Sequence, residues 1–409
     1  MNQQLPMNEL GYRVIGETVT GSPDGEPLPT HHPDTALWLW PGETPTFTRA
    51  SLDALFIWAY RLGASDIRLQ TNRPAFIELH GHLRIVTTRP LTETEIEEAV
   101  NRLYGADGQA RLKGGNDFDV SYTLLPDRRS RIRFRVNATP VLSQGDDGAA
   151  IVARTLPTRA PALADLDIEP AILESYRPRD GIVIIAGGTG NGKSTLLAAM
   201  TRAMLEDPDS DRPILEYSAP IEFVFDEIHS RSATIEQSEI PRHLPSFPAA
   251  IRNAMRRAPK NIIVGECRDE ETISAAVDAA ITQHVVYTTI HAGRGADTMQ
   301  RVVSLCPDGK RRALTVAFAQ SLRLIVNQRL VPSTDGKRTP LREFLVFDDK
   351  LRRRFLDTDP DKWPALAQDT VDAGEHGQSF AVAIRRALAA GRITEDLAQM
   401  LLKELGYVA

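Results

Sequence analysis

The spacing of apolar residues predicts a mixed domain of helices and strands over residues 49–156. One stretch, SLDALFIWAYRLG, has helical spacing, and LTETEIEEAVNRLY predicts a helix that starts with a capping box of Thr92 and Glu95. We expect AFIELHGHLRIV to form a hairpin that turns near Gly81. The other strand candidates are SDIRLQ, DFDVSYTLL and RIRFRVNATPV. The pattern is typical of a small α+β domain.

A different pattern follows over residues 171–345. Here continuous apolar runs alternate with helical stretches such as STLLAAMTRAML. Strands that are apolar on both faces and separated by helices predict a parallel sheet that is covered on both sides. The strand candidates are IVIIA, PILEY, NIIVGE and HVVYTTI.

Three segments lie outside these two domains. Residues 157–170 are punctuated by proline, which predicts a linker, and residues 346–409 contain the helical pattern FAVAIRRALAAGRITEDLAQMLLKELG. Residues 1–48 are rich in Pro, Gly and Thr and have no clear period, which indicates a flexible arm. We expect Trp38 and Trp40 to fix the end of that arm to a surface.

Composition narrows the class of protein. The 409 residues are 42% hydrophobic and 25% charged, as in globular proteins of two or three domains. A net charge of −6 argues against a protein that coats nucleic acid. No apolar segment approaches the roughly 18 residues of a membrane span, and the N-terminus lacks the features of a secretory signal. The two cysteines, Cys267 and Cys306, have no CxxC partner and fit a reducing compartment, so we expect a cytoplasmic protein.

The stretch GGTGNGKST predicts a phosphate-binding loop between a buried strand and a helix. It matches G-x-x-x-x-G-K-[ST], in which glycines let several backbone N–H groups reach phosphate oxygens together. The helix that follows turns its unpaired N–H groups toward the anion. Lys193 neutralises the β- and γ-phosphates, and the Ser194 hydroxyl is a ligand for Mg²⁺. No N-K-x-D string is present, which favours ATP over GTP. The predicted nucleotide-binding residues are Gly187, Gly188, Thr189, Gly190, Asn191, Gly192, Lys193, Ser194 and Thr195.

Two glutamates follow predicted strands. Glu222 comes shortly after PILEY, and Glu266 comes at the end of NIIVGE. Each on its own is more often a solvated loop residue. Ligands of open α/β sheets, however, sit at the carboxyl ends of the strands, so both carboxylates are expected to converge on the γ-phosphate. Two acids can divide the tasks of orienting water and supporting Mg²⁺.

Two histidines, His284 and His291, flank the strand of QHVVYTTIHA. Either one can sense the state of the γ-phosphate or couple it to a neighbour, or it can be an ordinary structural histidine. His291, at the carboxyl end of the strand, is the stronger candidate.

An alternating pattern appears in RIRFRVN of the first domain. A strand places Arg131, Arg133 and Arg135 on one face and the apolar residues between them on the other. This face is either solvated or compensated by an anion, because a row of like charges repels itself. A triphosphate is one such anion.

Taken together, these motifs resemble the secretion ATPases of type IV pili and of type II and type IV secretion, the PilT/VirB11-like superfamily. The family has a Walker A loop, an Asp box, a Walker B motif and a His box in that order. Here the corresponding stretches are GGTGNGKST, EYSAPIEFVFDEI, IIVGECRDEET and TQHVVYTTIHA. The resemblance extends through GASDIRLQ, HGHLRI and RFRVN in the first domain to SLRLIVNQRLV, and thus covers roughly residues 50–345.

The resemblance implies a PAS-like α+β N-terminal domain joined to a RecA-like P-loop ATPase domain, assembled as a hexameric ring with ATP between domains. It implies that Glu222 polarises the attacking water and that Glu266 is the Walker B acid supporting Mg²⁺. His284 and His291 are then the His-box pair. Arginines of the first domain reach the nucleotide, and the candidates are Arg133, Arg135 and Arg154.

One departure from the family pattern bears on the subgroup. Pilus retraction members typically carry two acids before the proline of the Asp box, where this chain has Ser218 and Ala219. Glu222 remains, which preserves the residue needed for hydrolysis. The changed box and the N-terminal arm resemble the DotB/TraJ branch of type IVB secretion and conjugation.

The leading hypothesis is therefore an ATP-hydrolysing hexameric motor of a type IV secretion or conjugation apparatus. It would work through inner-membrane components, with peripheral membrane association only and no stable binding of nucleic acid. Alternatives are a pilus retraction ATPase, a RecA-like nucleic-acid motor and an ATP-gated scaffold without turnover. A small-molecule kinase has the least support, because nothing after the phosphate loop resembles an acceptor site.

Overall fold

The computed structural model describes residues 14–15, 18–19, 38–127 and 130–407. Within them the chain forms two compact units, residues 1–158 and 159–409. Most of the predicted N-terminal arm lies outside the described residues. Its described parts are residues 38–48 and a two-stranded antiparallel pair, β1 (Val14–Ile15) and β2 (Thr18–Val19). At the end of the arm, Trp40 is buried against Phe47, as expected of a residue that holds the arm in place.

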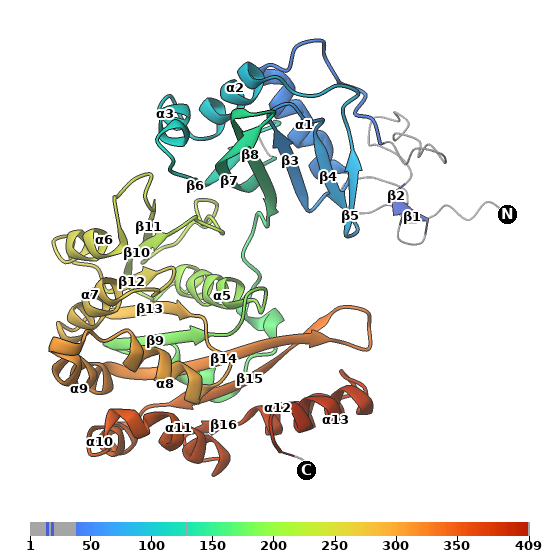
Figure 1. The fold of residues 1–409 in the computed structure, drawn as a ribbon. Helices are drawn as coiled ribbons and strands as arrows, with labels where there is room; N and C mark the ends of the chain where they lie inside the picture. The colour runs from blue at the N-terminus through green and yellow to red at the C-terminus, as the bar shows by residue number, and fades with distance from the viewer. Residues whose placement is uncertain (1–13, 16–17, 20–37, 128–129, 408–409) are drawn as a thin grey trace. The chain divides into compact units, whose positions relative to one another are not determined.

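The first unit has one antiparallel sheet of six strands, in the order β5-β4-β3-β8-β7-β6, with helices packed on one face (Figure 1). The predicted capping box is confirmed, because Thr92 and Glu95 bond each other's backbone N–H groups. The hairpin predicted near Gly81 is also present. The elements are α1 (Arg49–Arg61), β3 (Asp66–Gln70), β4 (Phe76–Leu79), β5 (His82–Ile85), α2 (Glu93–Leu103), α3 (Gly108–Lys113), β6 (Phe118–Leu124), β7 (Ile132–Ser143) and β8 (Asp146–Leu156).

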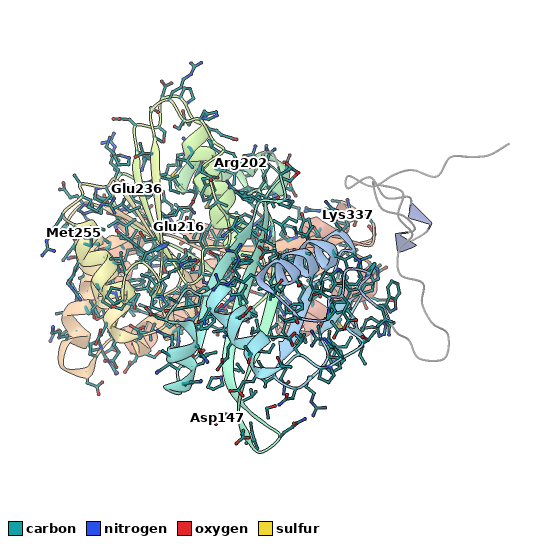
Figure 2. All side chains as sticks on the ribbon, turned by 90° about the horizontal axis from the view of Figure 1, so that it is seen from above. Asp147, Arg202, Glu216, Glu236, Met255 and Lys337 are labelled. Atoms are coloured by element: carbon teal, nitrogen blue, oxygen red, sulfur yellow. The ribbon has the colours of Figure 1, made fainter. Side chains whose placement is uncertain are left out.

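Strands β7 and β8 form the longest hairpin of this unit, with Asp147 at its tip (Figure 2). The alternation predicted for RIRFRVN holds in β7, where Ile132, Phe134 and Val136 are buried. The prediction that this strand presents three cations on one face is corrected. Arg131 precedes the strand, and Arg133 is itself only 2% exposed, so a solvated strand face does not describe it.

The second unit is built on an eight-stranded sheet with the order β11-β10-β12-β13-β9-β14-β15-β16 (Figure 1). The strands from β11 to β14 pair in parallel, as predicted, and β15 and β16 continue the sheet antiparallel. The strands are β9 (Gly181–Ala186), β10 (Pro213–Ser218), β11 (Thr234–Glu239), β12 (Asn261–Val264), β13 (Val285–Ile290), β14 (Leu322–Pro332), β15 (Arg338–Val346) and β16 (Gly377–Gln378).

Separate apolar cores cover the two faces of this sheet. On one face α4 and α5 pack on alternate residues of β9, such as Val183 and Ile185. On the other face Ile182 and Ile184 contact a core that includes residues of α6 to α11. A sheet buried on both sides accounts for the uninterrupted apolar runs in the sequence. The helices of both faces are α4 (Pro170–Ser175), α5 (Lys193–Glu206), α6 (Phe247–Ala254), α7 (Glu270–Ile281), α8 (Gly295–Ser304), α9 (Arg311–Ser321), α10 (Asp349–Leu356) and α11 (Trp363–Asp372).

The C-terminal segment is mostly helical, as its pattern predicts. Helices α12 (Phe380–Ala389) and α13 (Glu395–Glu404) build a small core with Val331 of β14 and Leu341 of β15. Single 3-10 turns also occur, η1 (Leu163–Leu166), η2 (Asp308–Lys310) and η3 (Pro360–Lys362). Among the described residues, no helix has both the length and the apolar character that crossing a membrane requires.

Candidate functional site

The phosphate loop joins β9 to α5 at the carboxyl edge of the parallel sheet. Gly187 and Gly192 have positive φ angles of 152° and 73°, which glycine adopts without strain. At Gly187 a Cβ atom would lie 2.4 Å from the carbonyl oxygen of Gln328 on β14. The loop therefore needs glycine here both for its backbone angles and for its close approach to the neighbouring strand.

Lys193 is the first residue of α5 and is 8% exposed. Its ammonium group donates to the carbonyl oxygens of Gly187 and Gly188, at 2.9 and 3.0 Å. Burial lowers the pKa of Lys193, and the negative charges of Glu266 and Glu222 oppose that shift. The lysine is thus folded onto its own loop, within the field of both predicted acids.

Glu266 lies two residues beyond the end of β12 and has two positively polarised neighbours. One carboxylate oxygen is 2.7 Å from a guanidinium nitrogen of Arg268, and the other is 3.3 Å from Nε2 of His291. Burial lowers the pKa of His291, as do the positive charge of Lys193 and two arginines, while Glu266 acts in the opposite direction. The net shift favours the neutral form of the His291 imidazole.

Glu222 follows β10 in the segment after Pro220. The backbone before it is held in place, because the N–H of Ile221 donates to Glu239, a carboxylate that is 1% exposed. The strands β10, β12, β13 and β9 are consecutive and parallel in the sheet. Their carboxyl ends bring Glu222, Glu266, His291 and the phosphate loop to one edge, as the sequence predicted.

His284 does not belong to this group. It precedes β13, and its carbonyl oxygen accepts from the N–H of Gly181 at the start of β9, which is the opposite edge of the sheet from the loop. Its Nδ1 lies 3.2 Å from the hydroxyl of Thr282 and from the carbonyl of Ala279. A six-residue strand of about 20 Å separates the two histidines. Its place argues against sensing the γ-phosphate at this site, and leaves coupling to a neighbour and an ordinary structural role as the alternatives for His284.

The arginine candidates of the first unit have acidic partners within that unit. Arg135 of β7 forms an ion pair with Asp119 of β6, and Arg154 of β8 pairs with Asp66 of β3 at 2.9 Å. The Arg154 side chain is 66% exposed and Asp66 is 3% exposed. Arg135 and Arg154 lie opposite each other in the β7–β8 register.

A magnesium ion would suit the donors at the loop. Ser194 is the second residue of α5, directly after Lys193, and Glu266 presents a carboxylate at the same edge. Magnesium typically takes one or two protein oxygens and completes its octahedron with phosphate and water. A cluster of three acidic or histidine ligands is absent from the part of the chain that the structure describes, and a site of this kind does not need one.

The sequence motifs alone did not predict two contacts of the site. Arg268 pairs with Glu266, and its place two residues further along the chain is the signal by which it could have been found. Gln328 holds the back of the loop, but its partner lies 137 residues away in the chain.

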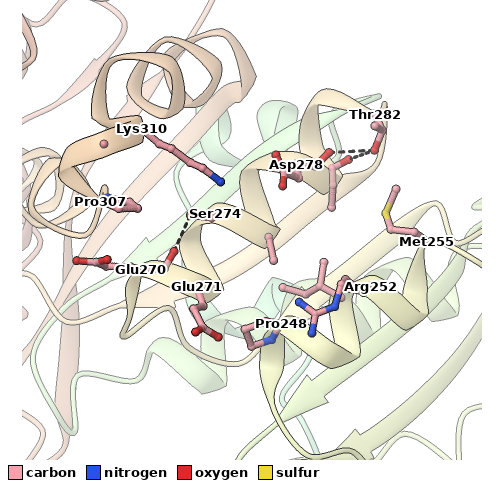
Figure 3. Close-up of a pocket in the computed structure, with 14 residues that line it drawn as sticks. Pro248, Arg252, Met255, Glu270, Glu271, Ser274, Asp278, Thr282, Pro307 and Lys310 are labelled. Carbon is pink, nitrogen blue, oxygen red and sulfur yellow. Dashed lines mark hydrogen bonds between the residues drawn. The ribbon is translucent and has the colours of Figure 1, made fainter.

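A hollow of about 850 Å³ opens between α6 and α7 (Figure 3). Arg252 and Met255 of α6 lie on one side, Glu270 and Asp278 of α7 on the other, and Lys310 at one end. Its lining contains none of the residues predicted to bind or hydrolyse nucleotide. It is therefore distinct from the site at the phosphate loop.

Several known proteins are similar to this chain in both sequence and fold. The family described as "Type II/IV secretion system protein" matches residues 52–386. The crystal structure of the ATPase DotB of Legionella pneumophila superimposes with a TM-score of 0.83 at 42% identity, covering 90% of this chain and 99% of that one. The pilus retraction motor PilT with bound ADP gives a TM-score of 0.72 at 27% identity, covering 85% and 95%.

Curated relatives agree with these matches. The type IV pilus retraction ATPase PilT of Pseudomonas aeruginosa is 28% identical over 346 residues, which is 84% of this chain and 96% of the relative. A twitching motility protein of Neisseria gonorrhoeae is 34% identical over 280 residues, 68% and 71% of the two chains. The predicted fold class, a PAS-like domain followed by a RecA-like domain, is confirmed. The chain therefore belongs to the type II/IV secretion system protein family and is an ATPase of that family.

Proposed function

We propose that this ATPase is the hexameric motor of a type IV secretion apparatus, of the type IVB or conjugative branch. The observation that best supports an ATPase site here is the arrangement of charges around Lys193. The carboxylates of Glu222 and Glu266, which follow two different strands, both favour the charged form of its buried ammonium group. The DotB likeness, at 42% identity over 90% of the chain, supports the branch. Ser218 and Ala219 in the Asp box point the same way.

The residues divide the chemistry as follows. The loop from Gly187 to Thr195 binds the triphosphate, and Lys193 exchanges its loop carbonyls for phosphate oxygens. Glu222 orients and polarises the attacking water. Ser194 and Glu266 would hold Mg²⁺, which supplies positive charge to the phosphate oxygens. His291 keeps Glu266 in position and senses the γ-phosphate.

Arginines of the first unit complete this proposal. Arg135 and Arg154 reach the nucleotide, either from the same chain or from an adjoining copy, whereas Arg133 is buried within its own unit. Arg135 and Arg154 would then exchange the carboxylates of Asp119 and Asp66 for phosphate oxygens. An arginine supplied to a γ-phosphate accelerates hydrolysis by about 10³ to 10⁵. ATP binding thereby draws the two units together across the linker of residues 157–170, and loss of the γ-phosphate releases them.

The proposal also covers location and partners. The motor would act from the cytoplasm and associate with the inner membrane peripherally, through components of the apparatus. We do not expect stable nucleic-acid binding, because the net charge is −6.

Pilus retraction is the second candidate function. It is favoured by the PilT relatives, which cover 84% of this chain in one case and 85% in another. The two motors share the same ATP chemistry and differ in the machine that they drive.

A mass measurement combined with a turnover assay tests this function. We expect steady phosphate release, and a hexamer in solution with Mg²⁺ and ATP. DNA should stimulate turnover by less than about twofold, since the chain is acidic. A monomer both with and without Mg²⁺ and ATP would contradict the ring, and strong DNA stimulation abolished by salt would favour a nucleic-acid motor.

A further inference from the structure

Strands β14 and β15 carry four polar side chains that are almost fully buried. Asn327 and Gln328 of β14 are 0% and 4% exposed, and Arg342 and Glu343 of β15 are 2% and 1% exposed. In the antiparallel register Gln328 lies opposite Arg342, and Asn327 lies opposite Glu343. Figure 1 shows these two strands as a long pair beside β9, the strand that leads into the phosphate loop.

Gln328 supports the phosphate loop from behind. Its side-chain NH₂ group donates to the carbonyl oxygen of Asn191 at 2.7 Å. The side chain of Asn191 in turn accepts from the N–H of Leu330, at 3.2 Å. Together with the close approach of Gly187 to the Gln328 carbonyl, these contacts fix the loop to β14 at both ends.

Arg342 connects the same glutamine to the segment before α4. Its Nε donates to Oε1 of Gln328 at 2.9 Å. Its terminal nitrogens donate to the carbonyl oxygens of Asp167 and Leu166, at 2.8 and 2.9 Å, and to the carboxylate of Glu169 at 3.2 Å. Residues 166–169 lie in the chain between β8 and β9, near the start of the second unit and within the stretch 157–170 that is predicted as a linker.

Stability alone does not call for an arginine at this place. Burial lowers the pKa of Arg342, and Glu169 only partly offsets the cost of removing the charge from water. Well-packed apolar residues in place of a buried ion pair are often neutral or stabilising. A guanidinium group differs from them in presenting several donors in a rigid plane, which fixes the distances between all of its partners.

We propose that Gln328 and Arg342 are positioning residues that couple the phosphate loop to residues 166–169, in the stretch that leads from the first unit into the second. The proposal deepens the proposed function and rests on it, because the loop must bind nucleotide. When Lys193 leaves the carbonyls of Gly187 and Gly188, the loop changes shape. The Gln328 side chain then moves with the Asn191 carbonyl, because the two are hydrogen-bonded. Arg342 transmits the shift to residues 166–169 through contacts that pack too tightly to absorb it.

Two variants break this chain of hydrogen bonds, and a third serves as the control. Gln328→Met removes the contact between β14 and the loop, and Arg342→Met removes the contact with the linker. Gln378→Met is the matched control. The Gln378 side chain donates to the Arg342 carbonyl at 3.0 Å and to Glu169 at 3.4 Å, so the control loosens the same cluster on its side away from the loop.

Hydrogen exchange on the full-length protein provides the readout, with and without Mg²⁺ and a non-hydrolysable ATP analogue. In the wild type we expect the analogue to slow exchange of the amides of residues 163–170 by about fivefold or more. This protection should fall below about twofold in Gln328→Met and Arg342→Met and persist in Gln378→Met. Wild-type protection in Gln328→Met would overturn the proposal.

Calorimetric titration of the analogue into the same samples distinguishes a failure of the proposed function from a failure of the proposed coupling. If the wild type does not bind the analogue, the proposed function fails. If it binds and residues 163–170 show no protection, the coupling fails while the function stands. The double variant tests the shared path, because its loss of protection should not exceed that of either single variant. Gln328→Met alone decides the case if Arg342→Met does not fold.

Discussion

His291 and Glu266 meet across the carboxyl ends of two neighbouring strands, with 3.3 Å between Nε2 and Oε1. Glu266 also pairs with Arg268 at 2.7 Å. Burial and the positive charge of Lys193 lower the pKa of His291, which favours the neutral imidazole beside Glu266. This contact joins the Walker B acid to the His box.

The first prediction concerns the pH dependence that follows from His291. Its pKa lies below 6.5, so kcat for ATP hydrolysis should fall on an acid limb centred below pH 6.5, where the imidazole gains a charge beside Lys193. In His291→Gln this limb should disappear or move. An acid limb above pH 6.5, or one unchanged in the variant, would exclude His291 as its source.

The same shift affects stability with a defined sign. The unfolded chain binds a proton at His291 more readily than the folded chain does. The folded state therefore loses stability as the pH falls below about 6.5 through the lowered pKa.

The second prediction concerns Lys193, whose ammonium is buried against two loop carbonyls. Lys193→Met should weaken ATP binding by roughly 2–5 kcal/mol, because charge-assisted contacts to phosphate are lost. The melting temperature without nucleotide should stay the same or rise, since the variant removes a poorly solvated charge. A parallel loss of binding and of melting temperature would instead assign Lys193 a structural role.

Arg154 allows a third test, of the arginines in the first unit. Its side chain is 66% exposed but its partner Asp66 is 3% exposed, so Arg154→Ala should lose some stability, and its folding is checked by melting before kcat is measured. On our proposal kcat drops by about 10³ or more while ATP binding changes by less than about threefold. Arg68→Ala is the control, because Arg68 lies on β3 of the same sheet, is 42% exposed and pairs with Glu78. Equal activities of the two variants would remove Arg154 from the site.

The fourth prediction concerns Glu95, the acid of the capping box. Burial by itself would raise the pKa of Glu95, but hydrogen bonds from Arg89, Phe47 and Thr92 lower it to about 2. A lowered carboxyl pKa adds stability above the unfolded value of about 4.5 that is lost as the pH falls toward 2. The free energy of unfolding of the first unit should decline over this window.

Urea unfolding followed by tryptophan fluorescence measures this effect, because three of the four tryptophans lie in the first unit. Glu95→Gln should lose about 3 kcal/mol at pH 7 and show a weaker dependence on acid. Glu93→Gln, at an exposed position in the first turn of the same helix, should behave like the wild type. An equal loss in both variants would rule out the buried network as the cause.

The part of the fold that the sequence predicted is the part with local signals. The apolar run before Gly187, the capping box at Thr92 and the strand-end position of Glu266 each depend on neighbours within a few residues. The buried Gln328 and Arg342 could not be found in this way, because their partners lie 137 and 14 residues away and the pairing of β14 with β15 sets their contacts.

The errors have the same physical origin. An alternating strand pattern states which residues share a face, but not what covers that face, so Arg133 was predicted among three cations on one face and is buried. The resemblance to the family's His box grouped His284 with His291, whereas the strand between them places the two at opposite edges of the sheet.

Phosphate release by Glu222→Gln beside the wild type tests the central claim most directly, with binding of ATP measured on the same samples. The account predicts that the variant binds ATP within about threefold of the wild type and turns over at least about 100-fold more slowly, because the water has lost its polarising carboxylate. Wild-type turnover in the variant would contradict the assignment of Glu222 and, with it, this account of the site.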